Sequence, residues 1–329
     1  MIIITGGAGF IGSNIAAGLQ ESGFSDLVIV DRLGDGEKWR NIAKRELHSV
    51  VRPEDLFDFL QAHVGEIDAV IHMGAISSTT ETDADLIVHN NFTLTMRLWR
   101  FCAACSKRFI YASSAATYGA GEAGFDDNES LAHLDSLRPL NAYGWSKALV
   151  DRAIARELAE GRPAPVQHVG LKFFNVYGPN EYHKGGQKSV IAHIFPEVMA
   201  DREVKLFKSY NPDYEDGQQL RDFVWVGDIV SVVLWLIGNP QVSGLFNVGS
   251  GEARSFYDLA AAVWAAVGKP PKIGYKEMPV ELREKYQYYT KAPLDKLRKA
   301  GYGSPMASLE AGVAEYVGKF LSCAKDPFR

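Results

Sequence analysis

Tyr143 and Lys147 are the residues of this sequence whose types and spacing best suit proton transfer. They stand four positions apart in Tyr143-Gly144-Trp145-Ser146-Lys147, so in a helix both side chains lie on one face. A free phenol has a pKa of about 10 and is a poor base at neutral pH, but a nearby Lys ammonium favours the phenolate. Ser114 could hydrogen-bond a substrate hydroxyl that loses its proton to Tyr143. Together the three residues predict an acid/base site, although a Tyr and a Lys at this spacing are, taken alone, more often structural.

A glycine-rich turn near the start of the chain favours the acid/base site over a purely structural role for Tyr143 and Lys147. Thr5-Gly6-Gly7-Ala8-Gly9-Phe10-Ile11-Gly12 follows an expected strand and opens an expected helix. Asp31 ends the next expected strand, 19 positions after Gly12. In such a unit the glycines permit the tight turn, the approach of a pyrophosphate and close helix packing, and the helix N-terminus offers free N–H groups. The pattern predicts a dinucleotide site, against the alternative of a glycine turn that binds nothing.

The choice of dinucleotide depends on the residues near Asp31. A carboxylate at this place binds a ribose diol, which favours NAD. Arg32, Lys38 and Arg52, with Arg40 between them, could instead neutralise a 2′-phosphate. Charged side chains in such a loop are often simply exposed to solvent and bind nothing. We expect NADP, with NAD as the alternative.

Short β-branched runs alternate with amphipathic segments in the N-terminal half, which is typical of a parallel sheet flanked by helices. Strands are expected at Ile2 to Thr5, Leu27 to Asp31, Asp68 to His72, Phe109 to Ser113 and Val166 to Phe174. Helices are expected at Gly12 to Glu21, Phe92 to Cys105 and Ala142 to Leu158, the last with Asn141 as N-cap.

The C-terminal half is less regular. Asp222 to Ile237 and Leu245 to Val248 each suggest a return to the sheet, and Ser209 to Gln219 predicts a polar surface loop. The expected fold class is α/β, a Rossmann-type doubly wound parallel sheet with a smaller, discontinuous C-terminal α/β substrate domain. The Rossmann domain is expected at 1–171, about 224–251 and 287–297, and the substrate domain at about 172–223, 252–286 and 298–329.

Composition excludes several classes of protein. The 329 residues carry 35 basic and 40 acidic side chains, a formal charge of −5, so no basic field exists for nucleic acid. Three Cys residues do not make a disulfide framework. Met1 leads directly into the first strand, and the apolar runs are too short to cross a membrane. We expect a soluble cytoplasmic protein without a metal, since Cys102-x-x-Cys105 suits one helical face and lacks a second ligand pair.

Four motifs follow one another along the chain: Gly6-Gly7-Ala8-Gly9-Phe10-Ile11-Gly12, His72-Met73-Gly74-Ala75, Ser113-Ser114-Ala115-Ala116-Thr117-Tyr118-Gly119 and Tyr143-x-x-x-Lys147. They resemble the extended short-chain dehydrogenase/reductase family, whose members act on nucleotide-linked sugars. Finer segments resemble one branch of it, the enzymes that epimerise C6 of an ADP-linked heptose: Ser77 to Glu81, Asn90-Asn91, Phe173 to Glu181, His183 to Gly185, Leu220 to Val224 and Lys285 to Thr290. The likeness extends from Met1 to about Tyr316.

The resemblance implies roles for individual residues. Tyr143 would be one acid/base with Lys147 as its partner, Ser114 the hydroxyl donor, and Lys184 a second acid/base on the other side of the sugar. The implied cofactor contacts are Gly6, Gly9, Phe10, Ile11, Gly12, Asp31, Arg32, Lys38, Arg52, Met73, Gly74, Ala75, Ser77, Asn90, Tyr143, Lys147 and Val176. The implied substrate contacts are Ser114, Asn175, Lys184, His193, Phe207, Arg221 and Tyr286, with Arg221 suited to clamp a diphosphate. The resemblance also implies a homo-oligomer, specifically a pentamer.

Several alternatives stay open at this stage. Lys184 and Lys188, in a glycine-flanked loop, could be merely solvated, and His193 could be a satisfied core histidine. His72, at a strand end, is better explained as a packed or backbone-bonded histidine than as a catalytic one. A 4-epimerase or 4,6-dehydratase acting on another nucleotide sugar is possible, although a dehydratase typically has an Asp-Glu pair where this chain has Ala115-Ala116. A nonenzymatic NADP-binding regulator of the same fold is more remote, because Ser114, Tyr143 and Lys147 are all intact.

Overall fold

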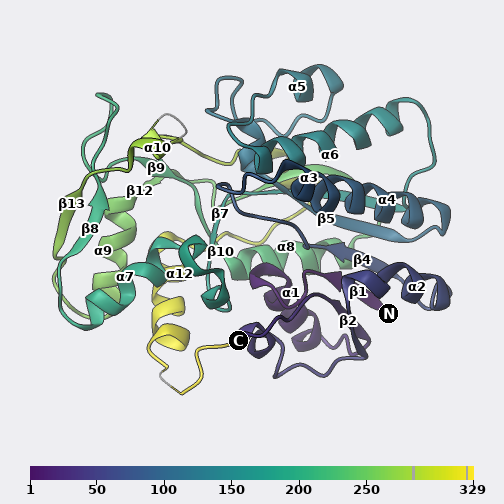
Figure 1. The fold of residues 1–329 in the computed structure, drawn as a ribbon, viewed down its shortest axis with the longest axis horizontal. Coiled ribbons are helices and arrows are strands. Elements are labelled where there is room, and N and C mark those ends of the chain that lie inside the picture. The colour runs from purple at the N-terminus through teal and green to yellow at the C-terminus, as the bar shows by residue number, and fades with distance from the viewer. Residues whose placement is uncertain (284–285, 324) are drawn as a thin grey trace.

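A parallel sheet runs through the centre of the computed structural model, which describes residues 1–283, 286–323 and 325–329. Within that part of the chain the sheet has seven strands in the order β11-β6-β5-β4-β1-β2-β3 (Figure 1). The strands are β1 Ile2–Thr5, β2 Leu27–Val30, β3 Ser49–Val51, β4 Ala69–His72, β5 Arg108–Ser114, β6 Gln167–Phe173 and β11 Gly244–Val248. The order reverses beside β1, which is the place where doubly wound sheets bind ligands.

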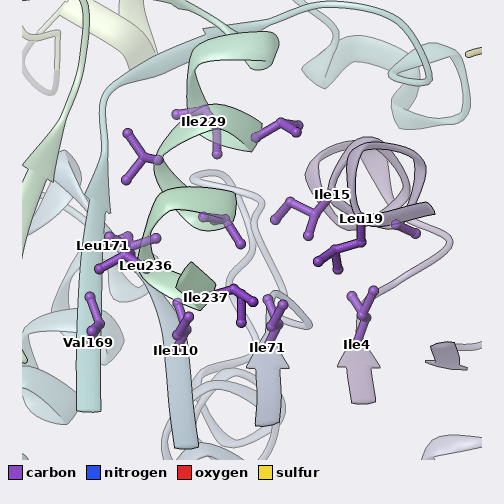
Figure 2. Packing of buried hydrophobic residues seen from close by; sticks show 14 of the residues in the cluster. Ile4, Ile15, Leu19, Ile71, Ile110, Val169, Leu171, Ile229, Leu236 and Ile237 are labelled. Carbon is purple, nitrogen blue, oxygen red and sulfur yellow. The ribbon is translucent and has the colours of Figure 1, made fainter. Parts of the chain in front are cut away.

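Helices cover both faces of this sheet because its strands are apolar on both sides. Ile4 of β1 points into the cluster beneath α1 and α8, to which Ile15, Leu19 and Leu236 also belong (Figure 2). Its neighbour Ile3 points into the opposite cluster, which α2, α4 and α6 cover. The covering helices are α1 Phe10–Glu21, α2 Leu56–Ala62, α4 Leu94–Ala104, α6 Ala142–Ala159 and α8 Val226–Gly238, while α3 Ala84–Ile87 and α5 Leu131–Ser136 pack against α6. The expected fold class is confirmed.

A smaller part with its own core lies beside the carboxyl end of the sheet (Figure 1). Its strands are β7 Asn175–Tyr177, β8 Val204–Phe207, β9 Leu220–Arg221, β10 Phe223–Trp225, β12 Arg254–Ser255 and β13 Ile273–Lys276. Its helices are α7 Val190–Met199, α9 Phe256–Ala266, α10 Val280–Arg283 and α12 Leu309–Glu315, while α11 Asp295–Lys299 contacts β11. The domain limits given above stay a prediction.

Short helical segments of other geometry complete the chain. The 3-10 segments are η1 Glu37–Asn41, η2 Pro53–Asp55, η4 Ala115–Tyr118 and η5 Tyr182–Gln187, and the π-helical segments are η3 Val88–Thr93 and η6 Tyr316–Leu321.

One expected element differs in its pairing. Asp222 to Ile237 does hold a strand followed by a helix, but β10 pairs with β7 rather than with the seven-stranded sheet. The cause lies at Asp222, whose carboxylate accepts hydrogen bonds from the backbone of Ser250, Gly251 and Ala292. These bonds hold the start of β10 against the segment after β11, where it pairs with β7 just past the carboxyl end of β6. The expected return of Leu245 to Val248 is confirmed, since β11 pairs in parallel with β6.

The loop from Ser209 to Gln219 connects β8 to β9. Tyr210 is 41% exposed, as expected of a surface loop. Gln219 at its end is buried, because its side chain turns inward toward the Phe207 carbonyl. The loop is therefore a surface loop only over its first part.

Candidate active site

Helix α6 begins at the place that brings Tyr143 and Lys147 to the carboxyl end of β5. The Asn141 side chain caps it by accepting the Gly144 N–H at 2.8 Å, as the sequence predicts. A methyl group on Gly144 would lie 2.6 Å from the Ala116 carbonyl oxygen. Glycine therefore lets the first turn of α6 pack against η4, next to Ser114.

Burial is the main cause of the pKa shifts of Tyr143 and Lys147, in the first two turns of α6. The Lys147 ammonium is buried and donates to the Ala112 carbonyl at 2.7 Å. Loss of solvation lowers the pKa of Lys147 to about 8, and the Asp151 carboxylate opposes that change. Burial raises the pKa of Tyr143, while the Ser114 side chain lowers it. Below pH 8 the site thus pairs a charged Lys147 with a phenol that needs help to ionise.

A cavity of about 510 Å³ unites the predicted catalytic residues. Ser114, Tyr143 and Lys147 line it from the sheet side, and Lys184 lines it from η5. The Lys184 ammonium lies 5.6 Å from the centre of the Phe10 ring. Burial lowers the pKa of Lys184, and the charge of Glu181 opposes this. Lys184 is therefore part of the cavity wall and not a freely solvated side chain.

The glycine turn between β1 and α1 fits a dinucleotide. Gly6 has a φ of +63°, and a methyl group on it would lie 2.6 Å from Gly74 Cα. Gly9 is the N-cap of α1 and has no side chain to occupy the helix N–H groups. A second cavity of about 220 Å³ adjoins this turn. The predicted residues that line it are Gly6, Asp31, Arg32, Lys38, Gly74, Ala75 and Asn90.

The cations near Asp31 are placed differently from one another. The Lys38 ammonium lies 2.5 Å from Asp31 Oδ1, and Arg32 pairs with Glu54. Arg52 pairs with Asp55 and its side chain is 74% exposed. Asp31 itself accepts the Ala8 N–H at 3.0 Å, which ties it to the glycine turn. Lys38 and Arg32 thus border the second cavity, whereas Arg52 reaches into solvent.

The predicted substrate residues divide between two cavities. Asn175 and Arg221 line the first, and Tyr286 lines both the first and a third cavity of about 700 Å³. His193 and Phe207 line the third. Since His193 is exposed on α7, it is not a core histidine. The first and third cavities therefore adjoin at Tyr286.

Comparison with known proteins decides the family. Residues 2–249 match the model of the NAD dependent epimerase/dehydratase family. The chain belongs to this family. A relative from Nitratidesulfovibrio vulgaris (strain DP4), named ADP-L-glycero-D-manno-heptose-6-epimerase, is 48% identical to it and covers 100% of both chains.

Solved structures of the epimerase/dehydratase family agree with the fold. The ADP-L-glycero-D-manno-heptose-6-epimerase of Helicobacter pylori is 29% identical, with a TM-score of 0.79, over 97% of this chain and 95% of that one. The UDP-glucose 4-epimerase of Thermus thermophilus, a complex with NAD, is 25% identical, with a TM-score of 0.75, over 98% of this chain and 99% of that one. Membership of this family, together with the glycine turn, assigns a nicotinamide dinucleotide to the site.

The remaining residues that the resemblance implies as cofactor contacts, apart from Arg52, line the first cavity or lie in the glycine turn. Phe10, Ile11, Met73, Ser77 and Val176 line the first cavity. Gly12 packs so closely under the turn that a methyl group on it would collide with the Gly6 carbonyl. As interpreted from the sequence, His72 is packed: its two ring nitrogens lie 2.6 and 2.8 Å from the Thr5 and Thr95 hydroxyls.

Arg221 is buried, and its position in this epimerase/dehydratase site is fixed by local contacts. Its guanidinium donates to the Leu220 carbonyl at 2.9 Å and to the Gln287 carbonyl, and it lies 5.0 Å from the centre of the Tyr286 ring. Burial lowers the pKa of Arg221. The Arg221 guanidinium therefore lines the first cavity and is held in place by these contacts.

Sequence reasoning missed several residues that line both the first and the third cavity. Lys188, Val190 and Phe256 belong to this group. Lys188 carried a signal, because it follows Lys184 in the same glycine-flanked loop. Phe256 carried none, since an aromatic residue that opens an apolar helix is ordinarily core.

Proposed function

We propose that this protein is an epimerase that inverts C6 of ADP-D-glycero-D-manno-heptose to give ADP-L-glycero-D-manno-heptose. One observation carries the proposal: Tyr143 and Lys184 come from separate elements and line the same cavity. A secondary alcohol is inverted when its carbon becomes a ketone and is then reduced from the other face. The oxygen must lose a proton in one orientation and regain it in another, so two separate acid/base groups are needed.

The residues of this chain have distinct parts in that reaction. The bound dinucleotide supplies reversible hydride transfer. Tyr143 exchanges the proton of the sugar hydroxyl on its side, Ser114 hydrogen-bonds that hydroxyl, and the Lys147 ammonium favours the phenolate. Lys184 exchanges the proton on the opposite side. Arg221 binds the diphosphate, and Asn175, His193, Phe207 and Tyr286 hold the rest of the nucleotide sugar.

The names of relatives support the choice of substrate. The relative from Nitratidesulfovibrio vulgaris is named for the ADP-heptose reaction and spans the whole chain. Ala115 and Ala116 follow Ser114 where a dehydratase typically has an acidic pair, which disfavours dehydration.

Product analysis tests the proposal. The protein is incubated with ADP-D-glycero-D-manno-heptose, and NMR follows the configuration at C6 together with the cofactor. We expect inversion without net consumption of cofactor. Tyr143→Phe should reduce turnover about 10²-fold or more. Unchanged substrate, with turnover of a UDP- or dTDP-hexose instead, would assign the protein to another reaction of the family.

We also propose that the cofactor is NADP. Arg32 and Lys38 border the second cavity beside Asp31, where they can neutralise a 2′-phosphate. Mass spectrometry of the cofactor released by denaturation distinguishes the two dinucleotides. Recovery of NAD alone would overturn this part of the proposal.

A cytoplasmic location and a homo-oligomer, specifically a pentamer, stay predictions. Cys102, Cys105 and Cys323 are free thiols, which suits a reducing compartment. Across the described residues, no helix combines the length and the apolar character that crossing a membrane would take. Light scattering of the purified protein measures the number of subunits directly.

A further inference from the structure

A buried ion pair lies directly behind the Tyr143 and Lys147 turn of α6. The Lys172 ammonium on β6 lies 3.0 Å from Asp151 Oδ2, and neither side chain is exposed to solvent. Asp151 also accepts the Tyr111 hydroxyl at 3.1 Å and the Ser113 hydroxyl at 2.7 Å. These three polar partners of the carboxylate are all fixed side chains of the sheet.

The pair connects the elements that carry the active site. Asp151 stands one helical turn after Lys147 on the same face of α6. Ser113 directly precedes Ser114. Lys172 donates to the Thr117 hydroxyl at 2.6 Å, and Thr117 donates to the Ser114 carbonyl at 2.8 Å. The network therefore fixes the end of β5 against the second and third turns of α6.

The charges around Lys147 can be assigned from every element packed near it. On β4, His72 is neutral because burial and the charge of Lys147 lower its pKa to about 3. On β5, burial and Asp151 raise the pKa of Tyr111 and keep its phenol neutral. On α6, burial raises the pKa of Tyr143 and keeps it protonated in the same way. On β6, Lys172 is held against Asp151. Among the described residues, Asp151 is thus the anion that acts on Lys147.

We infer that Asp151 is a positioning residue for the proposed reaction, because its fixed carboxylate keeps the Lys147 ammonium protonated beside Tyr143. The Lys172 ammonium neutralises that buried carboxylate, since an isolated buried charge would strongly destabilise the fold. The pair thus separates two tasks: Lys172 stabilises the fold, and Asp151 also sets the charge of Lys147. The inference rests on the proposed function for its catalytic meaning, but the state of Lys147 can be measured without substrate.

Three variants test the inference: Asp151→Asn, Lys172→Met and the double variant. The readout is an NMR titration of lysines labelled with ¹³C at Cε in the substrate-free protein, with the Lys147 signal identified by its absence in Lys147→Arg. We expect the proton affinity of Lys147 to fall about tenfold in Asp151→Asn, which leaves the Lys172 cation unopposed, and by a smaller but measurable factor in the double variant. Lys172→Met should leave that affinity unchanged or stronger. In each variant the alkaline limb of the pH profile of kcat should shift in the same direction as the titration of Lys147 in that variant.

The double variant separates positioning from structure. It contains no unpaired buried charge, so its resistance to denaturant should be close to that of the wild type even if both single variants unfold. A double variant that is stable and titrates at Lys147 like the wild type would overturn the inference and leave Asp151 a purely structural role. Absence of epimerisation in the wild type would overturn the proposed function instead, and the NMR titration would still decide the state of Lys147.

Discussion

Lys184 is the residue on which the proposed inversion depends most directly. Lys184→Met keeps the length of the side chain and removes its charge and its proton. We expect kcat to fall about 10²-fold or more, as for loss of a general acid/base, with a much smaller effect on KM. Steady-state kinetics on the ADP-heptose measure both. Lys319→Met is the matched control, because Lys319 in η6 is 69% exposed and pairs with Glu315 at the end of α12. Turnover of Lys184→Met equal to that of the control would remove Lys184 from the mechanism.

The turn between β1 and α1 shows at the scale of one element why glycine is required. A side chain at Gly6 would be strained by the φ of +63° and would lie against the Gly74 backbone. Since such strain is worth about 1–3 kcal/mol, Gly6→Ala should weaken dinucleotide binding about tenfold or more. Titration of NADPH fluorescence measures this. Gly65→Ala, where a methyl group meets open space, should bind like the wild type. Equal affinity in the two variants would contradict the assigned role of the turn.

Elements with strong local signals were predictable, and the short ones were not. Ile2–Thr5 has the predicted bounds, and α6 ends one residue beyond its predicted end, because apolar runs, the Asn141 cap and the glycine turn act within a few residues. β3 was missed, since its three residues become a strand only by pairing with β2. The same limit applies to β10, whose partner is decided by the distant contacts of Asp222. The first cavity followed this division: the motif residues Tyr143 and Lys147 line it, and Phe256, which also lines it, was not predicted.

A histidine at the end of strand β4 should make the stability of the fold decrease at acidic pH. His72 at its end is buried and neutral between two hydroxyls, with its pKa lowered to about 3 from 6.5. The unfolded chain binds a proton below pH 6.5 that the folded chain does not, so stability falls as pH decreases from 6.5 toward 3. Between about pH 7 and 5, protonation of His72 in the unfolded chain should lower the free energy of unfolding by about 2 kcal/mol. Urea unfolding at both pH values measures the loss, which should be smaller by that amount in His72→Gln. An equal loss in the two proteins would show that His72 titrates normally.

At the scale of the whole molecule, the site lies where two parts of the chain meet. The sheet part supplies Tyr143, Lys147 and the glycine turn, while β9 and η5 supply Arg221 and Lys184. No local pattern in the sequence could give the size of the cavity between them, because its walls come from segments that are far apart in the chain. The position of Lys184 therefore depends on contacts that hold η5 to the sheet part.

Phe328 makes one contact that holds η5 to the sheet part, and its contribution can be tested. Phe328 is 6% exposed, with the Arg40 guanidinium 4.4 Å from its ring centre and the Tyr182 ring at 5.3 Å. It thus packs η1, from the dinucleotide side, against η5, which carries Lys184. Phe328→Ala should lower the free energy of unfolding by about 2 kcal/mol, the value of one buried aromatic side chain. It should also lower kcat, since η5 loses its support. Phe24→Ala, at a site that is 38% exposed, is the control for both measurements. Loss of stability with unchanged kcat would show that η5 holds Lys184 in place without Phe328.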